Sequence, residues 1–254
     1  MLFRFPRIIS VLFLGILSVA PVYSQTVTFS GRVTDQNTGL GVPDVAVVAL
    51  GNQTGTRVAV TNSTGDYSIQ MGSNTNVKLR AYRTNFFFNP AVAGFTSIGG
   101  PLLGVHPLNF EGAALPPIFL LRQAPILLTE DNTLQALALD SVLLTRDPFR
   151  FVNPDYLGTD KQTRIKLLLV DLTLFSSETL SSISVQAIDN AQITHDLLVE
   201  DLQKVPGTPW MSQLTVRLPS DMAGPNELRI TVTPAGSSVL PGGLASNTAT
   251  VRVQ

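Results

Sequence analysis

The sequence predicts an all-β protein made of two β-sandwich domains in tandem after an N-terminal signal peptide. Short stretches of alternating apolar and polar residues recur between Gly, Pro, Asn and Asp residues, which is typical of sandwiches and barrels. Helical periodicity is nearly absent, and 254 residues suffice for one large domain or two small ones. We place the domains at residues 25–122 and 126–254, with the boundary at residues 122–125.

The N-terminus has the three-part layout of a secretory signal peptide. Arg4 and Arg7 supply positive charge, and residues 8–20 form an uninterrupted run of apolar and small residues. Small residues follow, which predicts cleavage between Ser24 and Gln25. The run is shorter than the about 20 residues of a membrane span, and an uncleaved anchor is the alternative. We expect a chain that is secreted, periplasmic or on the cell surface, with no membrane span after cleavage.

Composition excludes several classes of protein. Without the signal peptide the chain keeps 15 basic and 18 acidic side chains, a net charge of −3. This composition lacks the basic footprint of a nucleic-acid-binding protein. The absence of Cys excludes disulfides, thiolate metal sites and cysteine nucleophiles. An exported chain without disulfides favours a bacterial origin.

The first half contains a series of short strands separated by turn residues. The expected strands include alternating residues at 27–33, 67–71 and 77–82, and a strand at 45–50 whose residues are apolar on both faces. The spacing is compatible with a seven-stranded sandwich. Residues 89–125 hold six prolines, which predicts edge strands and loops, and residues 118–121 could close the domain.

Particular residues of this half have an expected structural role. Gly31 lies in a strand, where a missing side chain allows close backbone approach or a bulge. Gly65 supplies a positive φ in a hairpin, and Tyr67 enters the core directly after it. Pro43 fixes the entry into the next strand.

These residues lie in three segments that resemble the carboxypeptidase regulatory-like domain family. The segments are residues 29–35 (FSGRVTD), 41–47 (GVPDVAV) and 61–69 (TNSTGDYSI). Residues 86–91 (FFFNPA) are similar to the aromatic-Pro ending of related bacterial surface repeats. The resemblance spans about residues 26–120. It implies a transthyretin-like β-sandwich that is itself non-catalytic and accompanies peptidases, outer-membrane transporters or surface proteins.

The second half is most regular toward its end. Alternation predicts strands at residues 183–187, 214–218, 228–232 and 249–253, and an apolar run begins at Ile165. Residues 133–144 and 195–205 fit either a strand pair or a short helix, because short apolar runs satisfy both periods. We expect seven or eight strands.

This half more loosely resembles the immunoglobulin-like domains of bacterial exported proteins. The resemblance rests on residues 210–219 (WMSQLTVRLP) and 245–253 (ASNTATVRV). It implies a fold and no particular ligand.

The chain offers little catalytic or metal-binding chemistry. His106 and His195 are its two histidines, both expected in loops or polar stretches, and no Ser stands in a Gly-x-Ser-x-Gly elbow. Two separated histidines cannot form a zinc site. Residues 35–39 and 130–132 are candidate calcium loops, although such clusters ordinarily form turns. We predict no catalytic, cofactor-binding or metal-binding residue and no enzyme, with an unrecognised hydrolase as a remote alternative.

Two aromatic residues are candidates for contact with a ligand or with the other domain. Three consecutive Phe residues, 86–88, cannot all point inward from a strand, which singles out Phe87. Trp210 is the single Trp. The predicted function is a non-catalytic structural or binding module at the bacterial cell surface or in the periplasm. The alternative is a carbohydrate- or peptide-binding accessory of a separate enzyme, and the partner would be a protein or a glycan.

Overall fold

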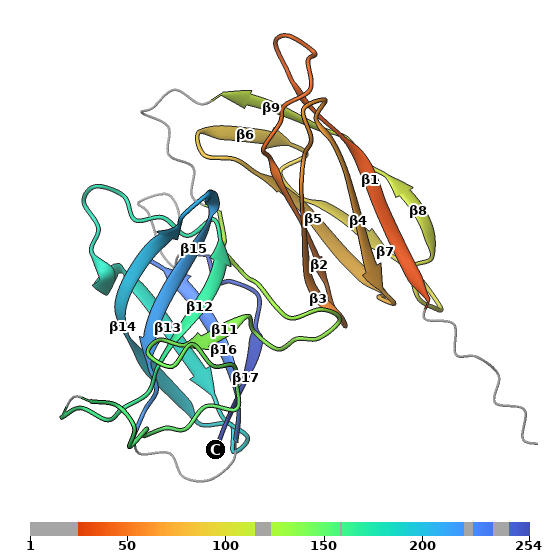
Figure 1. The fold of residues 1–254 in the computed structure, drawn as a ribbon. Coiled ribbons are helices and arrows are strands. Elements are labelled where there is room, and N and C mark those ends of the chain that lie inside the picture. Colours follow the sequence, from red (N-terminus) through yellow and green to blue (C-terminus); the bar gives the residue numbers. More distant parts are fainter. Residues whose placement is uncertain (1–24, 115–122, 158, 221–225, 236–243) are drawn as a thin grey trace, which may run out of the picture.

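The chain is nearly all β, in agreement with the predicted fold class, and its strands form several packed sheets (Figure 1). Within the described ranges a single short 3-10 helix occurs, η1 (Leu180–Ser182). Gln25 directly precedes the first strand, whereas Ser24 lies outside the described residues. The computed structural model describes residues 25–114, 123–157, 159–220, 226–235 and 244–254.

The first nine strands, here called the N-terminal group, form two packed sheets. One sheet has the order β4-β1-β9-β6, with β8 also paired to β1, and the other has the order β3-β2-β5-β7. The strands are β1 (Thr26–Asp35), β2 (Ala46–Gly51), β3 (Gly55–Val60), β4 (Asp66–Gly72), β5 (Asn76–Tyr82), β6 (Phe86–Asn89), β7 (Ala93–Thr96), β8 (Gly104–Pro107) and β9 (Phe110–Ala114).

The glycine and tyrosine expectations for this group are confirmed. A Cβ on Gly31 would lie 1.6 Å from the carbonyl oxygen of Leu108, so the strand needs glycine there. Gly65 has a φ of +83°, as the hairpin requires. Tyr67 is buried, and its hydroxyl donates a hydrogen bond to the carbonyl oxygen of Leu108 at 2.8 Å.

The N-terminal group has more strands than the predicted seven. Residues 89–125, expected to give edge strands and loops, provide β7, β8 and β9. Strand β9 lies between β1 and β6 rather than at an edge, and it contains no proline. Strands β8 and β9 both pair with β1 in parallel, a long-range pairing that local alternation does not reveal. Residues 118–121 lie outside the described residues.

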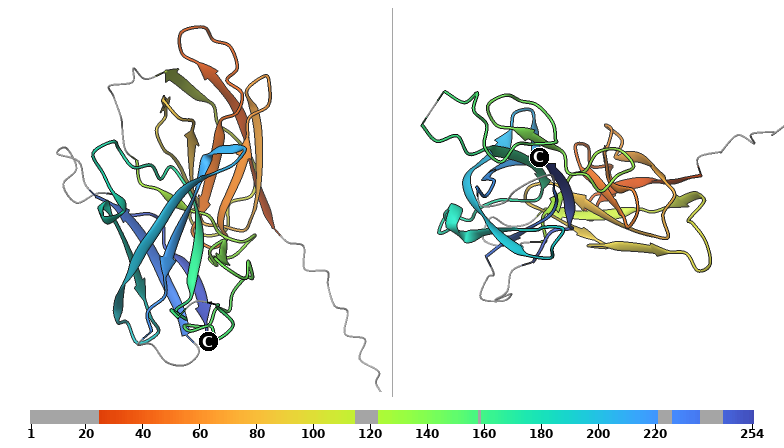
Figure 2. Two further views of the ribbon diagram at one scale, coloured as in Figure 1. Left: turned by 60° about the vertical axis from the view of Figure 1, so that its left-hand side comes forward. Right: turned by 90° about the horizontal axis from the view of Figure 1, so that it is seen from below.

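The later strands, here called the C-terminal group, form one eight-stranded sheet. Its order is β10-β12-β15-β14-β13-β16-β17, and β11 pairs with β12. Isolated bridges join Gln135 to Thr250 and Phe149 to Val253, so the sheet curls round until its two ends meet (Figure 2). The strands are β10 (Ile126–Leu127), β11 (Ala138–Asp140), β12 (Arg164–Val170), β13 (Ile183–Ile188), β14 (Thr194–Val205), β15 (Thr208–Arg217), β16 (Asn226–Pro234) and β17 (Ala249–Val253).

Strand β14 resolves one of the two ambiguous segments as a strand of 12 residues. It pairs with β13 up to Leu197 and with β15 from Leu198 onward. Strand β14 therefore connects the β10-β12-β15 half of the curled sheet to the β13-β16-β17 half. The register shifts between Val199 and Asp201, which leaves Glu200 at a bulge. The other ambiguous segment, residues 133–144, forms turns and the short strand β11.

Each group has its own buried apolar cluster, and a third cluster lies where the groups meet. The N-terminal cluster includes Phe29, Phe88 and Phe110, and the C-terminal cluster is mainly aliphatic. The division of the chain into two domains at residues 122–125 remains a prediction.

Candidate functional site

The interface between the two strand groups combines apolar packing, an ion pair and hydrogen bonds. Four buried residues form its apolar centre: Val48, Ile126, Leu128 and Val170. Six partly buried residues pack against them: Val58, Tyr82, Leu137, Leu168, Trp210 and Met211. The interface explains why β2 is apolar on both faces. Val47 and Ala49 point into the N-terminal core, whereas Val48 points toward the C-terminal group.

An ion pair crosses this interface beside the apolar cluster. Arg80 Nη2 donates to Asp171 Oδ2 at 2.6 Å, and Arg80 Nη1 donates to the carbonyl oxygen of Ala124 at 2.5 Å. The two side chains are only 10% and 15% exposed. Burial lowers the pKa of Arg80, and the charge of Asp171 opposes that effect. The backbone of Asp171 has a φ of +62°, a conformation that Asp tolerates better than most residues.

A loop of the C-terminal group, residues 129–133, attaches to the ends of β3 and β4. Thr56 and Thr129 exchange backbone-to-side-chain hydrogen bonds at 2.8 Å in both directions. Arg57 forms an ion pair with Asp131, and the backbone N–H of Gly72 donates to Asn132 Oδ1 at 3.2 Å. Figure 1 shows this pale green loop reaching the lower end of β3. The loop therefore fixes the position of one group against the other at a second point.

Gly55 allows this close approach. Its φ is +69°, and a Cβ there would lie 2.0 Å from the carbonyl oxygen of Thr133 and 2.1 Å from Thr129 Oγ1. A side chain at this position is therefore incompatible both with the turn and with the docked loop.

The two candidate calcium loops are engaged in other contacts. Asp35 Oδ1 accepts hydrogen bonds from the backbone of Asn37 and Thr38 and from the Thr38 hydroxyl, as a turn-forming carboxylate does. The other loop, residues 130–132, lies at the interface, where Glu130 pairs with Arg146. Among the described residues, no three His, Cys, Asp or Glu side chains are grouped closely enough to hold a metal ion.

The two singled-out aromatics occupy different settings. Trp210, on β15, packs against the apolar cluster of the interface. Phe87, on β6, is 37% exposed, while its neighbour Phe88 is buried in the N-terminal core. Phe86 stacks on Phe88 with ring centroids 6.0 Å apart. The structure thus does not bring Phe87 and Trp210 together in one cluster.

Both histidines lie in strands, which contradicts the loop expected at His106 and agrees with the strand alternative for residues 195–205. His106, on β8, stacks on Phe29 with ring centroids 5.5 Å apart, because β8 pairs with β1 beside it. His195, on β14, has its Nε2 3.1 Å from Asp189 Oδ2 and is largely buried. Hydrogen bonds, first from the backbone of Ile193 and then from His195, lower the pKa of Asp189. This contact closes the turn between β13 and β14.

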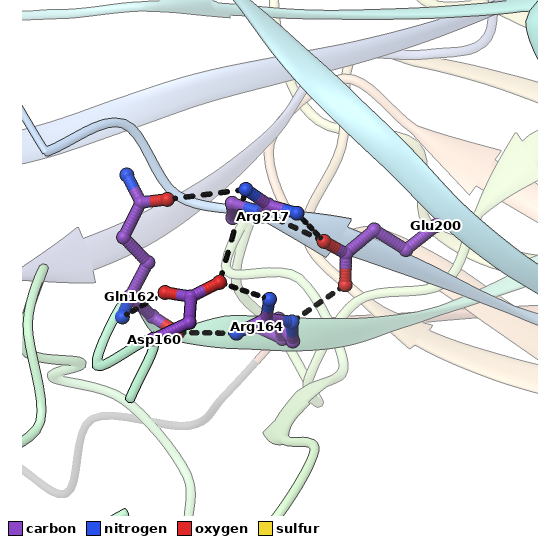
Figure 3. A network of polar contacts seen from close by, with 5 residues as sticks. All are labelled: Asp160, Gln162, Arg164, Glu200 and Arg217. Carbon is purple, nitrogen blue, oxygen red and sulfur yellow. Dashed lines mark hydrogen bonds and ion pairs between the residues drawn. The ribbon is translucent and has the colours of Figure 1, made fainter. Parts of the chain in front are cut away.

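A second polar network lies on the C-terminal group (Figure 3). Arg164 on β12 and Arg217 on β15 are paired in register, which places two positive charges side by side. Glu200 at the β14 bulge accepts from both, at 2.6 Å from Nε of Arg164 and 2.6 Å from Nε of Arg217. Asp160 accepts from Arg164 Nη2 at 2.5 Å, and Gln162 Oε1 accepts from Arg217 Nη1 at 3.3 Å. The network joins three strands and the segment before β12.

Both carboxylates of this network hold their charge to lower pH than usual. The hydrogen bond from Arg164 is the main cause that lowers the pKa of Asp160. Burial by itself raises the pKa of Glu200, but the hydrogen bonds from Arg164 and Arg217 outweigh it and lower the pKa. The network is therefore a structural connection whose donors and acceptors already satisfy one another.

The sequence did not predict the roles of Arg80 and Asp171, and it indicated residues 130–132 only as a candidate calcium loop or turn. One signal was present, because the two-sided apolar character of β2 indicates a second packing surface. The polar contacts beside that surface join residues far apart in sequence, with separations of 91 for Arg80–Asp171 and 73 for Thr56–Thr129. Neither pairing leaves a local pattern.

Comparisons with known proteins identify no family for this chain. No family model matches it, and no curated protein matches it. Among the described residues, no helix has the length and apolar character needed to span a membrane.

Several solved structures of bacterial pilins overlap with it at low similarity. The major pilin subunit BcpA of Bacillus cereus has 8% identity and a TM-score of 0.28, covering 91% of this chain and 70% of that one. A streptococcal ancillary pilin has 9% identity and a TM-score of 0.28, covering 91% and 61%. The shaft pilin SpaA of Lactobacillus rhamnosus GG has 7% identity and a TM-score of 0.27, covering 91% and 98%. Scores this low do not establish a shared fold.

Proposed function

We propose that the mature chain is an exported, non-catalytic structural module of the bacterial cell surface or periplasm. In this proposal two β-sandwich domains, residues 25–122 and 126–254, are held in one fixed relative orientation. The first domain would be a transthyretin-like sandwich of the carboxypeptidase regulatory-like type, as its sequence segments suggest. The second would be an immunoglobulin-like sandwich.

The interface is the observation that carries this proposal. A buried ion pair is costly to form, because both charges lose water, and apolar residues of similar size would often stabilise the contact as well or better. In this proposal the contact contributes specificity, because the Arg80–Asp171 pair and the Thr56–Thr129 exchange form only when residues of both groups are brought into place. Such a contact suits a module that transmits position or force rather than one whose halves move.

Two further observations support a role without catalysis. His106 is committed to aromatic packing and His195 to the contact with Asp189. The charged network around Glu200 has its hydrogen-bonding groups satisfied within the chain. In these positions the two histidines and the charged network contribute packing and hydrogen bonds within the fold.

Distance measurements between the two groups test the fixed orientation. The chain contains no Cys, so Ser68→Cys on β4 and Ser184→Cys on β13, both exposed, give a clean pair of spin-label sites. Pulsed electron paramagnetic resonance should give one narrow distance distribution, and the additional change Asp171→Asn should broaden it. A broad or multiple distribution in the otherwise unchanged protein would contradict the proposal.

Export has its own test. N-terminal sequencing of the protein recovered outside the cytoplasm should show Gln25 as the first residue. A chain that begins at Met1 would contradict cleavage and favour the N-terminal anchor.

A further inference from the structure

A cleft remains beside the interface, where the outer face of the β3-β2-β5-β7 sheet is not covered by the C-terminal group. It consists of two adjoining cavities of about 490 and 320 Å³, which share the lining residues Leu50, Lys78 and Asn247. Both volumes lie in the range of small-molecule sites, about 300 to 1,000 Å³. The cleft draws its walls from both strand groups.

The smaller cavity has mainly aliphatic walls, whereas the larger one combines Leu50 and Leu134 with polar residues: Asn52, Asn76, Lys78, Asn247 and Thr248. Two of the contributing side chains remain well exposed, Val92 at 49% and Leu134 at 42%. Covering apolar surface of this kind with a ligand is favourable, because the surface is removed from water. The main apolar lining residues are Val48, Leu50, Val92, Pro125, Ile126 and Leu134.

Lys78 differs from its neighbour Arg80 in one respect. Both residues lie on β5, two positions apart, so they share a face of the sheet. Arg80 is buried and paired with Asp171 from the C-terminal group. Lys78 is exposed and has no ion-pair partner among the described residues. None of the described residues lining either cavity is acidic.

The three asparagines that line the cleft with Lys78, namely Asn52, Asn76 and Asn247, are already hydrogen-bonded within the chain. Asn247 accepts a hydrogen bond from the backbone N–H of Leu127 at 2.8 Å and donates to its carbonyl oxygen at 3.0 Å. Lys78 is therefore the one cationic group of the cleft whose charge is not compensated within the described part of the chain. A ligand that complements this surface carries one negative charge and an apolar body.

We propose that this cleft binds a small amphiphilic anion, an aliphatic chain that bears a single carboxylate. The carboxylate contacts the Lys78 ammonium group, and the chain lies along Leu50 and Ile126. This binding role goes beyond the proposed structural function and does not depend on it, because the cleft needs only the observed contact between the groups.

Calorimetric titration of the mature chain, residues 25–254, with octanoate at pH 7.5 tests this proposal. We expect saturable binding of one octanoate per chain. Lys78→Gln should weaken it about tenfold, because a charge-assisted hydrogen bond is lost. The uncharged analogue 1-octanol should bind more weakly than octanoate. Leu50 lines both cavities, so Leu50→Trp should fill the space between them and abolish binding.

The matched control is Lys166→Gln, a lysine on β12 that lines neither cavity and should leave octanoate affinity unchanged. Thermal melting of every variant shows whether it is folded, and Lys78→Gln should melt like the parent because the side chain is exposed. Absence of saturable octanoate binding would overturn the proposal. Equal affinity for octanoate and 1-octanol, or an unchanged affinity in Lys78→Gln, would overturn it as well.

Discussion

The molecule uses Arg–carboxylate contacts in two regions with opposite surroundings. At the interface, one arginine meets one carboxylate inside a largely buried contact, Arg80 with Asp171. On the C-terminal group, two arginines share two carboxylates at a partly exposed surface, with Glu200 between them (Figure 3). Burial makes the first contact costly to form and costly to break, whereas water compensates for losses in the second.

The buried pair and the surface network should therefore affect different parts of the structure. A buried pair without its partner leaves an uncompensated charge, so an arrangement that separates Arg80 from Asp171 should be costly. The surface network instead fastens the bulge of β14 to β12 and β15 within a single sheet. Losing one of its members leaves the remaining groups free to bind water or each other. We therefore expect the interface to affect the orientation of the two groups and the network to affect the β14 bulge within one sheet.

The largest expected effect is that of Asp171→Asn. It leaves the buried Arg80 without a counter-charge, which should lower the free energy of unfolding by about 3 kcal/mol. Chemical denaturation monitored by circular dichroism measures the change. Asp155→Asn, at an exposed turn, is the control and should change stability little.

A double variant sharpens this prediction. Arg80→Met combined with Asp171→Asn removes both charges and should recover part of the stability lost in Asp171→Asn alone. A double variant that is less stable than Asp171→Asn would show that the penalty does not come from the stranded charge.

The next effect concerns the close approach at Gly55. Gly55→Ala forces an alanine to a positive φ and into contact with the 129–133 loop, which should cost about 2 kcal/mol or more. Gly39→Ala is a matched control, because Gly39 has the same φ of +69° and nothing within 4 Å of its Cβ position. It should cost about 1 kcal/mol from the backbone alone. Equal losses in the two variants would contradict a role for Gly55 in docking the loop.

Local patterns predicted most of the strands and little of what joins the two groups. Alternation located β4, β13, β16 and β17, because each buries one face against a core. Residues 89–125 were predicted to form edge strands and loops, but the parallel pairing of β8 and β9 with β1 was not predicted, because it joins residues 77 positions apart. Gly65 follows a local rule, because the positive φ of a hairpin favours glycine. Gly31 follows a different one, because a glycine inside a strand indicates close backbone approach, although the approaching residue, Leu108, is 77 positions away.

The interface had no such local signal. Asp171 follows a strand as many turn residues do, and only the folded chain shows that its carboxylate meets Arg80. For the same reason, residues 130–132 by themselves indicate an ordinary turn or a calcium loop. Their side chains form contacts across sequence separations of 60 to 74 residues. Polar pairings at such distances follow from the packing of the two groups and not from residue types.

A smaller effect is expected at the surface network. Glu200→Gln removes the charge that both arginines share, which should lower the free energy of unfolding by about 1 kcal/mol. Glu111→Gln, an exposed carboxylate on β9, is the control and should be nearly neutral. A loss as large as that of Asp171→Asn would remove the distinction between the buried and the surface contact.

The smallest expected effect is on the pH dependence of stability, which the Glu200→Gln variant tests. The pKa of Glu200 is lowered in the folded chain, because the hydrogen bonds from Arg164 and Arg217 outweigh the opposite effect of burial. Its stabilising contribution is therefore fully present above the unfolded-state pKa of about 4.3 and is lost as the pH falls through the lower folded-state pKa. The parent protein should lose stability toward low pH more steeply than Glu200→Gln. Denaturant midpoints at pH 7, 5, 4 and 3 should converge for the two proteins, and a gap that stays constant over this range would show that the charge of Glu200 does not stabilise the fold.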